Sequence, residues 1–173
     1  MSYLPCELHC HTIHSDGDFT VSELQKAAAD DHLAIIALPD HNTFSGWDEL
    51  DDNIIPAIRG IEWTTYFGHM LVLGANDFVD WRDAQPDNID EKIKQVKAVG
   101  GIVGIAHPYQ LGSPLCTGGR WEFNVRDWRN VDYIEVWHQN LYSAKRENER
   151  ALELWTSLLD KGYKIAATYG RGW

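Results

Sequence analysis

The sequence predicts an α/β domain with a mainly parallel sheet of about seven strands. Short, nearly continuous apolar runs such as "AIIAL" (34–38) and "GIVGIA" (101–106) are typical of strands that are buried on both faces. Amphipathic segments with helix start and stop signals alternate with these runs, as they do in βαβ units. The 173 residues suffice for a substantial core, so we expect a single domain over residues 1–173.

The first half of the chain supplies four of the expected strands and two helices. Thr20, followed three residues later by Glu23, forms a capping box that predicts the start of the first helix. A short turn around Gly68 is expected to join the third and fourth strands. The strands are expected at 3–12, 34–41, 54–66 and 69–75, and the helices at 20–33 and 43–52.

The second half continues the alternation with three strands and two longer helices. Gly100 and Gly162 stand where these helices are expected to end. The strands are expected at 101–108, 131–138 and 163–170, and the helices at 88–100 and 143–162. Residues 108–128 form a long connection of weak periodicity, and a loop of that length in a compact domain is more often functional than idle.

Composition excludes several classes of protein. The net charge of −11 disfavours general binding of nucleic acids, because an acidic surface repels phosphate backbones. The sequence contains neither a signal-peptide pattern nor an apolar run of membrane-spanning length. Cys6 and Cys10 would lie about 13 Å apart on a strand, too far for a disulfide. Together with Cys116 they make an odd count without an obvious disulfide framework, which suggests a reducing compartment. We therefore expect a cytoplasmic protein.

Polar residues gather where the predicted strands end. In "ELHCHTIHSDGD" (7–18), period-two alternation puts Glu7, His9 and His11 on one face and both cysteines on the other. Three further strands end near His, Asp or Glu side chains, at Asp40 and His41, at Glu62 and at His107. Chemistry in barrels and open parallel sheets is found at the carboxyl ends of strands, so these groups are expected to meet.

The chemistry of these side chains indicates a metal centre. Imidazole with carboxylate suits zinc, iron or manganese, and a carboxylate such as Glu62 could bridge two ions. Asp40 is expected to orient a ligand rather than to be one. Glu135 should point inward from its strand, with its role open, and His138 at the end of that strand is a further candidate.

Five segments resemble, in order, the motifs of the PHP domain (polymerase and histidinol phosphatase), a family of metal-dependent phosphoesterases. They are "ELHCHTIHSDG", "ALPDHNTFSGW", "IRGIEW", "GHMLVLG" and "GGIVGIAHP". The resemblance implies a distorted seven-stranded β/α (TIM-like) barrel with about two or three divalent metals, zinc, iron or manganese. A metal-bridging hydroxide would then attack a small phosphate monoester or diester.

The resemblance also implies roles for individual residues. His9, His11 and Glu62 would hold one metal; Glu62, His69 and His107 a second; Asp16 and His41 would contribute to a third. Asp16, His41 and Glu62 would thus serve catalysis, and His14 beside them could assist the leaving group. A phosphate could also contact "CTGGR" (116–120), although an ordinary glycine-rich turn accounts for that stretch as well.

One motif of the family departs from its pattern. An Asp-x-His usually follows the last strand, but here Gly172 stands at the place of the aspartate and Trp173 is the last residue given. The resemblance therefore leaves three interpretations: a phosphoesterase, in full or C-terminally shortened form; a metal-dependent hydrolase of a carboxylic ester, amide or carbamate; or a degenerate PHP domain that binds metal without catalysis. Oligomeric state and substrate identity have no signal in the sequence.

Overall fold

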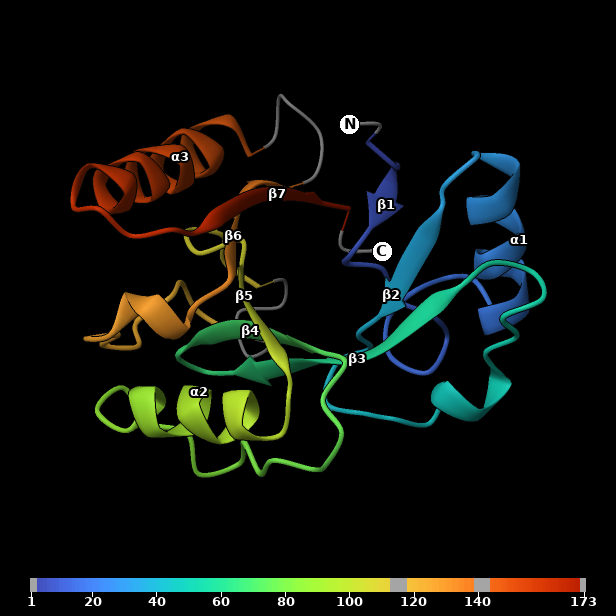
Figure 1. The fold of residues 1–173 in the computed structure, drawn as a ribbon, viewed down its shortest axis with the longest axis horizontal. Helices are drawn as coiled ribbons and strands as arrows, with labels where there is room; N and C mark the ends of the chain where they lie inside the picture. The colour runs from blue at the N-terminus through green and yellow to red at the C-terminus, as the bar shows by residue number, and fades with distance from the viewer. Residues whose placement is uncertain (1–2, 113–117, 139–143, 172–173) are drawn as a thin grey trace.

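The computed structural model describes residues 3–112, 118–138 and 144–171, which form one seven-stranded sheet (Figure 1). The strands occur in the sheet in the same order as in the sequence. They are β1 (Cys6–Glu7), β2 (Ile35–Leu38), β3 (Ala57–Thr65), β4 (Gly68–Leu73), β5 (Ile102–Ala106), β6 (Tyr133–His138) and β7 (Ala166–Gly170). The α-helices are α1 (Val21–Asp30), α2 (Ile89–Ala98) and α3 (Lys145–Asp160).

The direction of β4 is the exception in the mainly parallel sheet that the sequence predicts. Parallel pairing holds from β1 to β3 and from β5 to β7, whereas β4 runs antiparallel to both of its neighbours. The reason is local, because only Tyr66 and Phe67 connect β3 to β4 and a parallel crossover needs a dozen residues or more. Gly68 allows this tight hairpin through its φ of 121°.

The sheet curls into a nearly closed barrel, as predicted. Its first and last strands, β1 and β7, approach each other in Figure 1 without pairing. Arg171, just after β7, bridges this seam, with its Nε 3.6 Å from Glu7 Oε2 and its Nη1 3.7 Å from Asp31 Oδ2. An ion-paired seam thus takes the place of the hydrogen bonds that would close the barrel.

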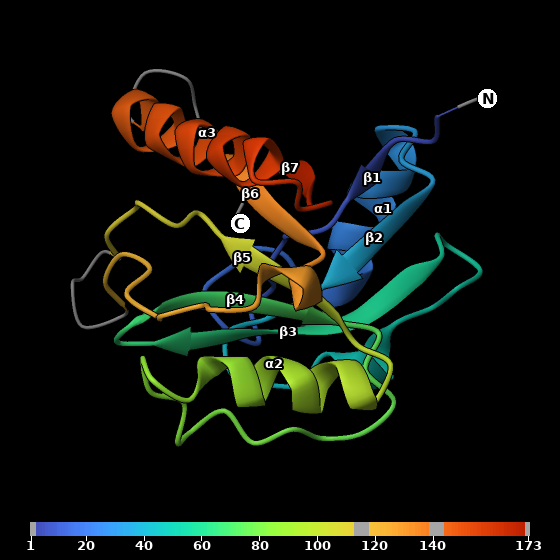
Figure 2. The same ribbon diagram turned by 60° about the vertical axis from the view of Figure 1, so that its left-hand side comes forward.

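Apolar residues fill the space on both sides of the strands. Leu71, Leu73 and Tyr133 cluster inside the barrel, and the Tyr133 ring packs so closely on Gly104 that it leaves no room for a side chain there. Outside the barrel, α2 packs beneath the β3–β4 hairpin and α3 packs along β6 (Figure 2). This double packing holds the strand ends that carry the polar residues in fixed relative positions.

Most sequence-predicted elements are confirmed, with two marked differences. The capping box at Thr20 is present and starts α1. The first strand spans only Cys6–Glu7 rather than 3–12, and the helix expected at 43–52 is a single 3-10 turn, Trp47–Glu49. In the described part of the 108–128 connection, the structure contains one 3-10 turn, Trp128–Asn130, at its end. Among the described residues, no helix has the length and apolarity needed to cross a membrane.

Candidate metal centre

Glu62 is the centre of the polar cluster. It lies in β3, where alternation turns Ile61 and Trp63 into the outer core and Glu62 into the barrel, and it is completely buried. Five imidazoles surround its carboxylate, with nitrogen-to-oxygen distances of 3.2 Å to His9, 3.3 Å to His11, 2.9 Å to His41, 2.9 Å to His69 and 3.3 Å to His107. The predicted convergence of these strand ends is thus present.

His9 and His11 reach this carboxylate from the segment that follows β1. The prediction placed both on the first strand, but β1 ends before them, at Glu7. Both rings are nevertheless fully buried. The His9 backbone N–H donates to Glu7 Oε1 at 3.0 Å, which fixes the chain where it leaves the strand. The two Nε2 atoms lie 3.1 Å apart and face Glu62 together, as two ligands of one ion would.

Asp40 stabilises the loop that follows His11. Its carboxylate accepts hydrogen bonds from the backbone and hydroxyl of Thr12, at 2.8 and 2.7 Å, and from the Ser15 hydroxyl at 2.5 Å. Asp40 therefore orients the loop rather than a ligand histidine, the group that we expected it to hold. The loop places Asp16 near His41, with Asp16 Oδ2 3.4 Å from His41 Nε2.

His69 joins the cluster because β4 is antiparallel. It stands at the start of β4, and the reversed direction brings this start to the edge where β3 and β5 end, opposite Thr64 and Ala106. Gly118 packs against the ring so closely that an added Cβ would lie 2.2 Å from His69 Nε2. The long connection therefore borders the cluster, although Cys116 and Thr117 of "CTGGR" fall outside the described residues.

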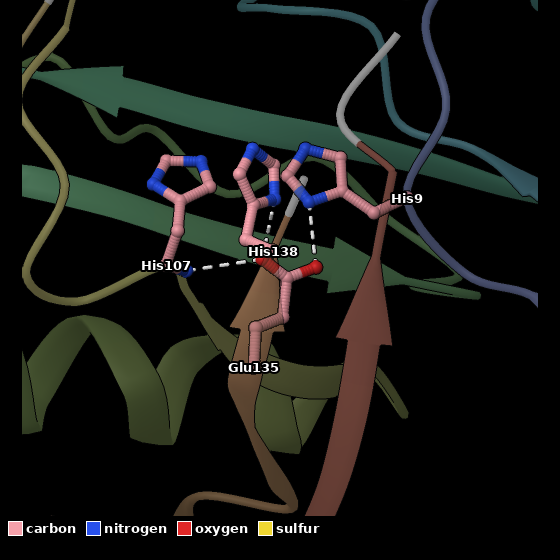
Figure 3. Close-up of side chains that lie close together, drawn as sticks. All are labelled: His9, His107, Glu135 and His138. Atoms are coloured by element: carbon pink, nitrogen blue, oxygen red, sulfur yellow. Dashed lines mark hydrogen bonds and ion pairs between the residues drawn. The ribbon is translucent and has the colours of Figure 1, made fainter. Parts of the chain in front are cut away.

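A second carboxylate, Glu135, lies on the far side of His9. Glu135 Oε1 is 2.6 Å from His9 Nδ1, and Oε2 accepts the backbone N–H of His107 at 3.0 Å. His138, from the end of β6, sits over the same carboxylate with its Nδ1 3.7 Å away, as Figure 3 shows. Sequence alternation indicated that Glu135 points inward, but its partner is 126 residues away and no local pattern reveals it.

The charges of these groups are strongly coupled. Burial by itself raises the pKa of Glu62, but the charge of His9 and hydrogen bonds from neighbouring imidazoles outweigh it and hold that pKa well below its usual range. Burial lowers the pKa of His9, but Glu135 and Glu62 outweigh it and raise that pKa well above its usual value. Burial, with His107 and His9 nearby, lowers the pKa of His138 to about 2. In the metal-free protein, the fold therefore favours the protonated form of His9, with which a bound cation would compete.

Four groups of side chains present ligand atoms close enough together to hold a metal. They are His9, His11 and Glu62; His11, Asp16 and His41; His41, Glu62 and His69; and His9, His107, Glu135 and His138. The first group is the one expected from the sequence. The second contains the expected pair Asp16 and His41. The expected set of Glu62, His69 and His107 is divided, because His69 groups with His41, and the His107 ring lies beside His138, with ring centroids 4.4 Å apart.

One expected site residue, His14, lies apart from these groups. The ring of His14 contacts Ser45 and Glu49, with its nitrogens 2.8 Å from each partner, and so belongs to the rim. Gly172, at the position of the family's aspartate, lies outside the described residues. The arrangement that the structure does show is a buried set of imidazoles and carboxylates that opens toward solvent at Asp16 and His41, whose side chains are 64% and 24% exposed.

Sequence comparison finds a distant relative of this chain but no matching family. No family model matches the chain. An uncharacterized protein of Methanocaldococcus jannaschii is 27% identical over 109 residues, which are 63% of this chain and 48% of that protein, so the chain spans about half the length of this curated relative.

Three solved structures have the same fold. One, described as a candidate metal-dependent phosphoesterase of Bifidobacterium adolescentis, is 18% identical with a TM-score of 0.64, covering 99% of this chain and 88% of its own. Another, from Bacteroides vulgatus, is a two-domain protein containing a predicted PHP-like metal-dependent phosphoesterase, 21% identical with a TM-score of 0.66, covering 95% and 52%. An amidohydrolase of Chromobacterium violaceum with bound sulfate is 18% identical, with a TM-score of 0.65, covering 96% and 86%. The PHP resemblance of the motifs is thus confirmed at the level of the fold.

Proposed function

We propose that this chain is a metal-dependent hydrolase of the PHP type that cleaves a small phosphate monoester or diester. The observation that carries the proposal is the buried Glu62 carboxylate, which five imidazoles surround at 2.9–3.3 Å. A structural role alone seldom requires so many titratable groups around one charge, because each must be desolvated. Their convergence supports a site built to hold cations.

The residues present fit divalent ions. Imidazole and carboxylate suit zinc, iron or manganese, and two or three ions could be shared among the overlapping groups around Glu62. The His11 ring makes its polar contacts through Nε2, 3.1 Å from His9 Nε2 and 3.3 Å from Glu62 Oε2, while its buried Nδ1 has no hydrogen-bond partner. Bound ions would act as Lewis acids and would lower the pKa of water to supply the nucleophile.

The chain itself would position the substrate. Because His9 and His11 are buried while Asp16 and His41 are partly exposed, a substrate would enter from the Asp16 side. Asp40 fixes the loop through Thr12 and keeps that entrance in place. Since the protein carries a net charge of −11, an anionic phosphate would be attracted only where bound cations reverse the local field.

The second candidate function is hydrolysis of a carboxylic ester, amide or carbamate. The name of the Chromobacterium violaceum protein, an amidohydrolase, favours it. The same ions would then polarise a carbonyl instead of a phosphoryl oxygen. A non-catalytic metal-binding domain remains the third interpretation, and all three share the centre around Glu62.

A substrate panel tests the proposal. Protein loaded with Mn²⁺, Zn²⁺ or Fe²⁺ would be assayed with p-nitrophenyl phosphate, bis-p-nitrophenyl phosphate and p-nitrophenyl acetate, beside Glu62→Ala. We expect turnover of a phosphate ester that Glu62→Ala and chelator both abolish. Turnover of the acetate alone would favour the acyl hydrolase, and bound metal without any turnover would favour the non-catalytic domain.

A further inference from the structure

Glu135 contacts two different ligand-bearing segments with its two oxygens. It lies in β6 and is 1% exposed. Its Oε1 is 2.6 Å from His9 Nδ1, and its Oε2 accepts the backbone N–H of His107 at 3.0 Å. In Figure 3 the carboxylate lies beneath the rings of His9 and His138, with His107 beside them. One side chain thus links β6 to the segments after β1 and β5.

The contact with His9 determines which ring nitrogen faces the centre. When Nδ1 carries hydrogen and donates to Glu135, the opposite nitrogen, Nε2, is the one that offers its lone pair. That Nε2 lies 3.1 Å from His11 Nε2 and 3.2 Å from Glu62 Oε2, where an ion would be shared. Metal-bound histidines commonly donate their other N–H to a carboxylate, which fixes the ring orientation and makes the ligand more basic.

The contact with His107 acts through the backbone. His107 has a φ of 25°, a strained conformation that residues other than glycine rarely adopt. The hydrogen bond from its N–H to Glu135 helps to stabilise this conformation at the end of β5. The ring then projects toward the centre, with Nε2 3.3 Å from Glu62 Oε1.

The surroundings leave Glu135 little freedom to move. An added Cβ on Gly170 in β7 would lie 2.2 Å from Glu135 Oε1, so only glycine leaves room for the carboxylate at that position. His138 does not compete for the carboxylate through a hydrogen bond, since its Nδ1 is 3.7 Å away. Asn148 of α3 instead holds the His138 backbone with two hydrogen bonds of 3.1 Å.

We propose that Glu135 is a positioning residue of the metal centre, which orients the His9 ring and the His107 backbone at once and is not itself a ligand. The proposal rests on the metal centre of the proposed function. It distinguishes Glu135 from Glu62, because one Glu135 oxygen faces His9 Nδ1 and the other accepts the backbone N–H of His107, whereas Glu62 faces imidazole rings alone. Gly170 contributes to the same arrangement, because its lack of a side chain leaves the space that the Glu135 carboxylate occupies.

The test compares wild type, Glu135→Gln and Gly170→Ala, with Tyr169→Ala as the control for an alteration of β7 at an exposed neighbour. Zn²⁺ affinity would be measured by chelator competition and the ligand set by the absorption spectrum of the Co²⁺-saturated protein. Circular dichroism of each metal-free protein would establish folding. A glutamine offers one acceptor oxygen where Glu135 offers two, so it cannot satisfy both donors.

We expect Glu135→Gln and Gly170→Ala each to weaken Zn²⁺ binding by about 10–100-fold. Their Co²⁺ spectra at saturation and their metal stoichiometry should match wild type, and Tyr169→Ala should bind as wild type does. Unchanged affinity in folded Glu135→Gln, while wild type binds metal, would overturn this proposal alone. A shifted spectrum or loss of one ion would overturn it by making Glu135 a ligand. No metal in wild type would overturn the proposed function and this proposal with it.

Discussion

Replacing Glu62 by glutamine removes the negative charge at the middle of the five imidazoles and changes the volume little. In the metal-free protein, the low pKa of Glu62 means that the folded state stabilises its ionised form. A group whose pKa is depressed by folding contributes stability that is present above its unfolded pKa, near 4.5, and is lost as the pH falls through its folded pKa. At pH 7 this contribution is fully present.

The expected magnitude follows from the burial of the pair. Glu62 and His9 are both 0% exposed, and the removal of one partner from a buried ion pair costs about 3–5 kcal/mol. In a domain of this size that loss lowers the melting temperature by roughly 6–20 °C. Urea unfolding of both proteins, with chelator present, would be followed by circular dichroism at pH 7 and again at more acidic pH.

The control and the pH series make the prediction specific. Glu149→Gln removes an exposed partner of Lys145, 3.7 Å away, and should change stability by less than about 1 kcal/mol. The difference between wild type and Glu62→Gln should shrink as the pH falls below about 4.5. Equal stability of the two proteins at pH 7, or a difference that grows in acid, would refute the reasoning.

Three further predictions concern neighbouring features. Asp40→Asn weakens the charged hydrogen bonds to Thr12 and should lower the free energy of unfolding by about 2 kcal/mol, whereas unchanged urea unfolding would contradict the loop-holding role. Gly104→Ala places a Cβ 2.0 Å from Tyr133 Cζ and should destabilise by about 1–3 kcal/mol; a more stable variant would show that the barrel interior has spare room. Folding raises the pKa of His9 above its usual value near 6.5, so metal competes with a proton there, and Zn²⁺ affinity should rise as the pH increases above about 6.5. A flat profile in chelator competition would argue against His9 as a ligand.

The sequence predicted the architecture well where local rules decide it. Apolar runs located the strands, and the capping box at Thr20 located the start of α1. The main error was the length of the first strand, which spans Cys6–Glu7 rather than 3–12. The two residues between β3 and β4, Tyr66 and Phe67, carry the signal for a hairpin, since so short a connection permits only antiparallel strands.

The sequence predicted which residues gather at the candidate site better than it predicted which of them contact one another. The spacing of His9 and His11 placed both near Glu62 even though β1 ends at Glu7, because an extended segment keeps alternate side chains on one face beyond its last ladder hydrogen bond. The contact of Glu135 with His9 joins residues 126 positions apart and depends on the curl of the barrel. A single sequence contains no local pattern that specifies such a contact.

The most direct test of the metal centre is the metal content per chain, measured by elemental analysis on protein purified without chelator. His9→Ala/His11→Ala serves as the matched variant, because it removes two of the imidazoles that face Glu62. We predict near-stoichiometric zinc, iron or manganese in the wild type and a marked fall in the variant. Wild-type protein that contains no metal, even after reloading with each ion, would contradict the account.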